Sequence, residues 1–145
     1  MKEKLLISAC LLGIGCRYDG GRVKKVDVDA LRERYDLVPV CPEIYGGLST
    51  PRTPSERVGD RVVMKDGRDV TENFLRGMQS TLDIAEAAGA RLALLKARSP
   101  SCGKGEIYDG SFTGRLTAGD GFTTEHLLSR DITVYTEEEI DKLLK

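Results

Sequence analysis

Four short apolar runs, separated by segments of helical character, constrain the fold of this chain more than any other feature of its sequence. The runs are continuous instead of alternating with polar residues, which is typical of strands covered on both faces. Strands that alternate with helices pair mostly in parallel, through right-handed crossovers. The sequence therefore predicts an α/β fold with an open, mostly parallel sheet. The predicted strands are Leu5–Ala9, Leu37–Val40, Leu92–Leu95 and Ile132–Tyr135.

Helical segments fill the intervals and predict a three-layer architecture of the Rossmann-like or flavodoxin-like kind. In the strongest segment, Asp69–Ala88, apolar side chains recur at helical spacing. Asp69 and Glu72 resemble a capping box at its start, and Gly89 is a natural stop. Shorter helices are predicted at Val28–Asp36, at Thr123–Asp131 and from Thr136 onward.

Two stretches depart from this alternation of strands and helices. Asp66-Gly67 lies between short flanks in "RVVMKDGRDV", which is typical of a tight turn and predicts a small β-hairpin added at an edge of the sheet. The glycine-rich stretch Gly105–Thr123 is predicted to be a surface excursion near the functional site.

Length and charge predict a single domain, residues 1–145, that acts on a small molecule. The 22 lysines and arginines nearly balance the 23 acidic residues, giving a net charge of -1. This lacks the basic footprint of a nucleic-acid binder, so a nucleic-acid partner is not expected. No glycine fingerprint for nucleotide phosphates is present either.

The amino terminus indicates a cytoplasmic protein. Only Leu5, Leu6 and Ile7 precede the small residues of "LISAC", too few for the apolar core of a signal peptide. No run is long enough to cross a membrane. In a reducing compartment the four cysteines are expected to bind metal or act in catalysis instead of forming disulfides.

Three of the four cysteines lie just beyond predicted strands. Cys10 follows "LLISA", Cys41 follows "LVPV", and Cys102 follows "LALLKA" after a short turn. The carboxyl ends of parallel strands share one edge of a sheet, where ligands bind, so the three thiols are expected to converge. Their spacing is not that of a zinc finger. Three thiolates with an open position suit a metal with a vacancy or an iron–sulfur cluster with one free iron.

The fourth cysteine, Cys16, lies six residues after Cys10 and does not directly follow a strand. Three roles remain open for it: a fourth ligand, a second redox thiol, or packing under the loop.

Polar residues beside the thiols have both chemical and plain interpretations. Glu43 is placed to shuttle protons, or to pair with Arg52 or Arg57. Ser99 and its neighbour Ser101 either bind substrate or cap the turn around Pro100.

The basic residues near the site have similar alternatives. Lys96 and Arg98 either favour the thiolate of Cys102 by their charge or remain solvated. Arg52 either binds an anion or a carbonyl oxygen, or forms an ion pair with Glu56.

Three motifs around these residues resemble the TudS-like family of 2-thiouracil desulfidases, long catalogued as a domain of unknown function. The motifs are "ISACLLG…CRYDG", "CPEIYGGLSTPRTPSE" and "KARSPSCGKGEIYDGSF", and the likeness covers nearly the whole chain. The resemblance implies a [4Fe–4S] cluster held by Cys10, Cys41 and Cys102, with its fourth iron free of protein ligands. Ligation by Cys16 would remove that vacancy.

The same resemblance implies a reaction. The free iron would capture the sulfur of a thiocarbonyl, and water would add at carbon. A thiolated pyrimidine such as 2-thiouracil would thus give uracil and hydrogen sulfide, with no net redox change. Glu43 matches the family's acid/base position and Ser99 its substrate-positioning serine.

Two other classes of function use the same thiols. A cysteine-persulfide sulfur transferase, with Cys16 as the resolving thiol, needs no iron. A non-enzymatic module that binds zinc or a cluster would deliver metal or sulfur to a partner, and would not need Glu43. The expected partner of the desulfidase is a small thiolated base, since the near-neutral charge disfavours tRNA.

Overall fold

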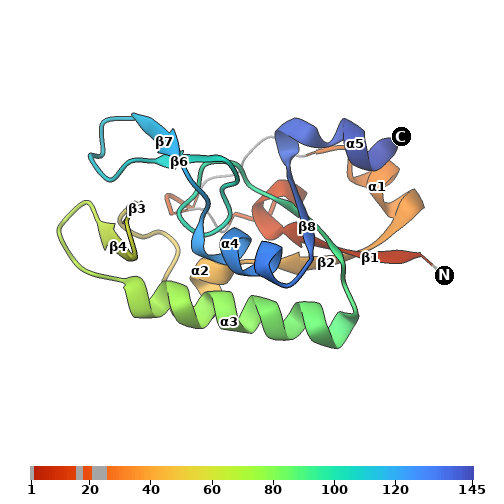
Figure 1. Cartoon of the computed structure of the whole chain (residues 1–145), viewed down its shortest axis with the longest axis horizontal. Coiled ribbons are helices and arrows are strands. Elements are labelled where there is room, and N and C mark those ends of the chain that lie inside the picture. Colours follow the sequence, from red (N-terminus) through yellow and green to blue (C-terminus); the bar gives the residue numbers. More distant parts are fainter. Residues whose placement is uncertain (1, 16–17, 21–25) are drawn as a thin grey trace.

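A four-stranded parallel sheet forms the centre of the computed structural model, which describes residues 2–15, 18–20 and 26–145 (Figure 1). The strand order is β2–β1–β5–β8, and every neighbouring pair is parallel. The chain therefore leaves β1 toward one side for β2 and crosses to the other side for β5 and β8. The four strands are β1 (Glu3–Ser8), β2 (Tyr35–Val40), β5 (Leu92–Leu95) and β8 (Thr133–Thr136).

Helices cover both faces of this sheet, because each strand carries apolar residues on both sides. Leu5 and Ile7 of β1 pack with Leu31 of α1 (Val28–Arg34) and Leu143 of α5 (Asp141–Leu144). Leu6, which points the other way, belongs to a cluster formed with α3 (Thr71–Ala88) and α4 (Phe122–Ser129). The predicted three-layer α/β architecture is confirmed.

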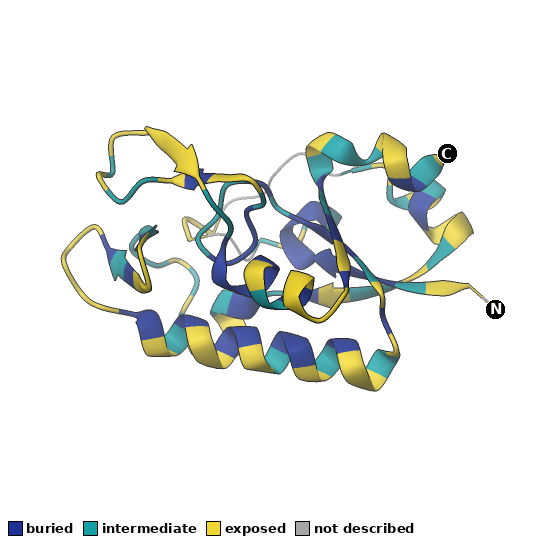
Figure 2. Ribbon diagram, viewed as in Figure 1, coloured by how far each residue is buried: buried dark blue, intermediate teal, exposed yellow. Residues whose placement is uncertain are grey.

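The long helix α3 begins at Thr71, two residues later than predicted. The expected capping box does not form. Instead, Asp69 lies outside the helix and accepts a hydrogen bond from the Thr71 backbone N–H at 2.9 Å. At its other end Gly89 takes a left-handed conformation with φ 68°, as its position in the sequence predicted. Figure 2 shows the inner face of this helix buried and its outer face exposed.

The last predicted helix divides into two short pieces. Thr136 and Glu139 form a capping box around a 3-10 turn, η2 (Glu137–Glu139), and α5 follows it. Of the helices within the described ranges, none combines the length and the apolar character that a membrane span requires.

Two small antiparallel sheets lie at the end of the molecule away from the chain termini (Figure 1). One pairs β3 (Ser55–Val58) with β4 (Arg61–Met64), and the other pairs β6 (Glu106–Tyr108) with β7 (Leu116–Ala118). The second lies within the glycine-rich stretch that was predicted to leave the core.

The predicted hairpin at Asp66-Gly67 forms as a turn with antiparallel flanks, but it lies outside the central sheet. The turn exists, because the Gly67 N–H donates to the Met64 carbonyl at 2.8 Å. The Met64 N–H donates to the Arg68 carbonyl at 2.8 Å and the Val70 N–H to the Val62 carbonyl at 2.9 Å, on either side of an antiparallel bridge between Val63 and Asp69. β4 also pairs with β3 through Gly59-Asp60, in a sheet separate from the central one.

Candidate active site

A cavity of about 410 Å³ lies beyond the carboxyl ends of β1, β2 and β5. Parallel sheets bind ligands at this edge, where the strand order changes direction. All five described candidates from the sequence line the cavity, and Cys16 lies outside the described residues. The five are Cys10, Cys41, Glu43, Ser99 and Cys102.

Cys10 is placed by a tight turn directly after β1. It belongs to the 3-10 helix η1 (Ala9–Leu12) and is only 8% exposed. Gly13 ends this turn with φ 87°, a conformation that favours glycine, and its N–H donates to the Cys10 carbonyl at 3.1 Å. The turn thus holds the thiol at the edge of the sheet.

Cys41 and Glu43 are placed by the short helix α2 (Pro42–Tyr45). Cys41 is the extended residue before this helix, and Pro42 occupies its first turn, where its missing N–H costs nothing. Two glycines let α2 approach α3 closely. A Cβ at Gly77 would lie 1.9 Å from the Pro42 carbonyl oxygen, and one at Gly46 would lie 2.0 Å from a backbone oxygen of α3. The contact between the two helices therefore fixes the positions of the thiol and the carboxylate.

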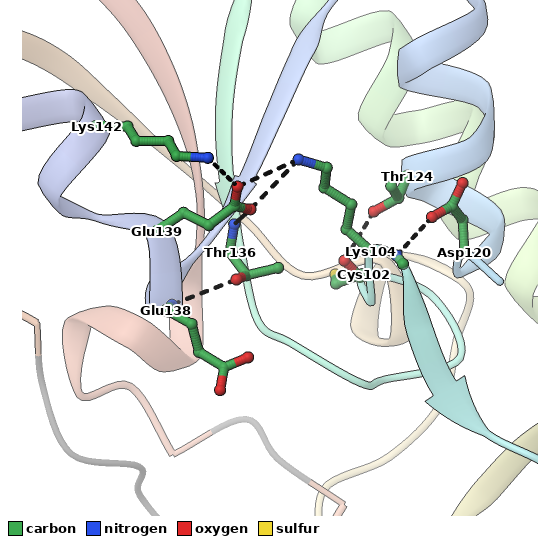
Figure 3. Close-up of polar contacts among 9 residues, drawn as sticks. Cys102, Lys104, Asp120, Thr124, Thr136, Glu138, Glu139 and Lys142 are labelled. Atoms are coloured by element: carbon green, nitrogen blue, oxygen red, sulfur yellow. Dashed lines mark hydrogen bonds and ion pairs between the residues drawn. The ribbon is translucent and has the colours of Figure 1, made fainter. Parts of the chain in front are cut away.

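Cys102 lies on a turn held by the start of α4. The backbone N–H groups of Phe122 and Thr123 donate to the carbonyls of Pro100 and Ser101, both at 2.9 Å. The Thr124 hydroxyl donates to the Cys102 carbonyl at 2.7 Å (Figure 3). The first residues of α4 therefore donate hydrogen bonds to the carbonyl groups of this turn. The same bonds give a partner to N–H groups of the first helical turn, which have none within the helix.

Two carboxylate side chains from other segments hold the residues that follow Cys102, as Figure 3 shows. Lys104 pairs with Glu139 at 3.3 Å, and Glu139 belongs to the capping box after β8. Asp120 accepts a hydrogen bond from the Gly105 N–H at 2.8 Å. Both contacts lie outside the cavity, so we assign them a structural role.

The Ser99 hydroxyl does cap the turn, because it accepts a hydrogen bond from the Cys102 N–H at 2.7 Å. Ser99 also lines the cavity. The cap uses a lone pair of the Ser99 oxygen. Its hydrogen faces the Ser101 oxygen at 3.4 Å, because the Ser101 hydrogen is directed at Glu43, so a ligand would take the Ser99 hydrogen from this long contact.

Glu43 is held by two donors. The Ser101 hydroxyl donates to one carboxylate oxygen, and the Arg52 guanidinium donates to the other at 3.4 Å. Ser101 is fully buried, and the Arg52 side chain is 7% exposed. Arg57, the other cation considered for Glu43, pairs instead with Glu125 on α4. A carboxylate fixed in this way faces the cavity in one orientation.

Arg52 forms an ion pair with Glu43, and not with Glu56 as the sequence analysis expected. Arg52 binds Glu43, whereas Glu56 accepts hydrogen bonds from the backbone N–H groups of Gly110 and Phe112 at 2.9 and 3.1 Å. Glu56 thereby connects β3 to the loop between β6 and β7.

Burial raises the pKa of the Cys102 thiol to about 12, and the negative charges of Glu43 and Cys41 add to this effect. Hydrogen bonds with Ser101 and Ser8 oppose it only in part. The thiol is therefore protonated at neutral pH when no metal is bound.

Both cations for which two interpretations were left open, Lys96 and Arg98, form ion pairs away from the Cys102 thiol. Lys96 pairs with Glu137 at 2.7 Å and Arg98 pairs with Glu138 at 2.9 Å, so the carboxylates after β8 neutralise both charges.

The donor set at the cavity fits a cluster better than a single ion. Among the described residues, no group of three or more histidine, cysteine, aspartate or glutamate side chains is arranged to hold a metal ion. Cys10, Cys41 and Cys102 nevertheless line one cavity. An iron–sulfur cluster is larger than one ion, so its ligands lie further apart, and cysteine thiolates are its usual ligands.

Sequence reasoning did not predict the contacts of two residues of this site. Ser101 was, like Ser99, a candidate for substrate binding or for capping the turn, whereas the structure shows it in contact with Glu43. Glu56 was treated as an ion-pair partner, yet it is a buried acid that lines the cavity. No local pattern marks either residue, because their contacts join segments more than fifty residues apart.

The family model of 2-thiouracil desulfurase matches residues 5–139. The uncharacterized protein YbbK of Bacillus subtilis (strain 168) is 37% identical over 150 residues, which cover 97% of this chain and 99% of that protein. A solved structure described as the [4Fe-4S]-dependent thiouracil desulfidase TudS is 47% identical. It superposes with a TM-score of 0.92, covering 98% of this chain and 95% of that one. From these matches, together with the fold and the cavity, we conclude that the chain belongs to the 2-thiouracil desulfurase family.

Proposed function

We propose that this protein is a [4Fe–4S]-dependent desulfidase that acts on a thiolated pyrimidine. With 2-thiouracil, water and the base would give uracil and hydrogen sulfide, with oxygen replacing sulfur and no net redox change. The observation that carries the proposal is the meeting of three thiols and one carboxylate, from three strand ends, at a single cavity. The 47% identical neighbour, described as a thiouracil desulfidase, supports it.

Cys10, Cys41 and Cys102 are the residues that would hold the cluster. Thiolates are soft ligands suited to iron–sulfur clusters, and ligation overcomes the raised pKa of Cys102 because metal binding releases the thiol proton. When bound through three cysteines, the cluster supplies an iron that is free to act as a Lewis acid on the sulfur of a thiocarbonyl.

Glu43 would carry the protons. Held by Ser101 and Arg52, its carboxylate is fixed at the cavity wall, where it takes a proton from the attacking water and returns it toward the departing sulfur. Ser99, whose oxygen accepts from the Cys102 N–H, would offer its own hydrogen to the base and orient it.

The size of the cavity supports a small substrate. Sites for small ligands and cofactors have volumes of roughly 300–1,000 Å³, and about 410 Å³ lies within that range. A free base fits this expectation.

Replacing Glu43 by Gln tests the proposed function. The Glu43→Gln protein, purified without oxygen, should keep its iron and lose turnover of 2-thiouracil by about 100-fold or more, because a positioned acid–base group contributes roughly 10²–10⁴-fold. Glu106→Gln, an exposed glutamate on β6, is the matched control and should remain active. Full turnover in Glu43→Gln would contradict the proposed role. Turnover by an iron-free wild type would favour persulfide transfer instead.

A further inference from the structure

Glu56 is a buried acid at the candidate site that the proposed reaction does not use. It lies on β3, is 8% exposed, and lines the same cavity as the three thiols. A buried carboxylate is normally paired with a cation. Within the described ranges of the chain, no lysine, arginine or histidine forms an ion pair with Glu56.

One oxygen of this carboxylate fixes the loop between β6 and β7. The Oε1 atom accepts hydrogen bonds from the N–H groups of Gly110 and Phe112. The loop lies against β3 so closely that a Cβ at Gly110 would come within 2.4 Å of the Val58 side chain. Phe112, in the same loop, has φ 58°, which is unusual for a phenylalanine, and it lines the cavity.

The other oxygen, Oε2, receives no hydrogen bond from any residue that the structure describes. Thr123 Oγ1, and not Glu56 Oε2, is the buried side-chain oxygen that lacks a partner among the described residues, so Oε2 is reached by solvent and is open to a ligand. An ionised carboxylate only accepts hydrogen bonds, so a ligand that displaces water from Oε2 has to offer a donor.

We propose that Glu56 recognises the ring of the substrate, with Oε2 accepting a hydrogen bond from a ring N–H while Phe112 packs against the ring. The inference rests on the proposed function and names its substrate class: cyclic thioamides with an unsubstituted ring nitrogen. The ring nitrogens of 2-thiouracil carry such hydrogens, and a hydrogen bond to a charged acceptor is stronger than a neutral one. The carboxylate of Glu56 thus both positions the Phe112 ring and selects the base.

Glu56→Gln separates these two roles because the amide oxygen can still accept from Gly110 and Phe112. The amide nitrogen then replaces Oε2 and places a donor opposite the donor of the ring. We expect kcat/KM for 2-thiouracil to fall about 100-fold, mostly through KM, since sites built for a hydrogen bond reject a mismatched partner strongly. Iron per chain should equal that of the wild type, and uracil should bind more weakly as a competitive inhibitor.

Methylated bases supply the second arm of the test. 1-Methyl- and 3-methyl-2-thiouracil each lack one ring N–H. For the base that lacks the recognised N–H, Glu56→Gln should change kcat/KM by less than about threefold, because the lost interaction is already absent. For the other methylated base the roughly 100-fold loss should persist. Glu106→Gln should behave as the wild type with all three bases.

Each result decides between recognition and a structural role. An equal loss with all three bases would mean that Glu56 only supports the loop, and no loss with any base would mean that it does not contact the substrate; either overturns this inference and leaves the desulfidase standing. A wild type that holds iron but releases no sulfide from any of the bases overturns the proposed function and this inference together.

Discussion

Ser101 shows how a single hydroxyl can organise the candidate site. It is fully buried, donates to Glu43, and lies 3.4 Å from the Cys102 sulfur. The residue is therefore a positioning group between a carboxylate and a thiol that lie 59 positions apart in sequence.

Ser101→Ala should lower kcat for 2-thiouracil about tenfold to 100-fold, because Glu43 loses the donor that aims it and is left partly unsatisfied. Iron per chain should stay at the wild-type value. Ser129→Ala, in an exposed hydroxyl on α4, is the control and should leave kcat unchanged. A wild-type kcat in Ser101→Ala would show that Glu43 needs no such support.

The thiol of Cys102 gives a pH dependence to the metal-free protein. Its pKa is raised to about 12 in the folded state, above the ordinary value of 9.0, chiefly by burial. The unfolded chain therefore loses this proton first as the pH rises. The contribution of the neutral Cys102 thiol to the free energy of unfolding is fully present below pH 9. It is lost progressively as the pH rises toward 12, by up to about 4 kcal/mol.

Urea unfolding of the metal-free protein between pH 8 and pH 10.5 measures this effect. The wild type should lose more stability over that interval than Cys102→Ala, which has no thiol to titrate there. Identical slopes for the two proteins would show that Cys102 is not buried as a neutral thiol.

At the scale of elements, the contact between α2 and α3 sets the site. Gly77→Ala would place a methyl group against the Pro42 backbone, and a backbone atom cannot move out of the way without shifting α2. We expect a loss of roughly 1–3 kcal/mol in the free energy of unfolding, as for other overpacked sites, with reduced iron binding. Glu86→Ala, on the exposed face of α3, should change stability by less than about 0.5 kcal/mol.

Chemical denaturation and iron content of the two variants check this prediction. A Gly77→Ala protein as stable as Glu86→Ala would mean that the close helix contact can relax at no cost.

Local sequence signals predicted the elements better than their pairing. Continuous apolar runs identified all four central strands, and Gly89 identified the end of α3. Asp66-Gly67 is equally clear as a turn, and the residues on both sides of it pair. The longer ladder of β4, however, is with β3 through Gly59-Asp60, a turn that the sequence analysis did not single out.

At the scale of the whole molecule, topology brings the site together. The order β2–β1–β5–β8 puts the carboxyl ends of three strands around one cavity, so the convergence of Cys10, Cys41 and Cys102 was predictable from their positions after strands. The hydrogen bonds of Ser101 and Glu56, and the raised pKa of Cys102, were not. They depend on which distant side chains and loops meet there, and no periodicity encodes that.

The central proposal is that Cys10, Cys41 and Cys102 hold a cluster at this cavity without a ligand from Cys16. Iron and acid-labile sulfide per chain, measured after purification without oxygen, test it most directly. The wild type and Cys16→Ser should contain about four iron atoms per chain, whereas Cys10→Ser, Cys41→Ser and Cys102→Ser should each lose most of theirs. Loss of iron in Cys16→Ser, or retention of it in all three other variants, would contradict the account.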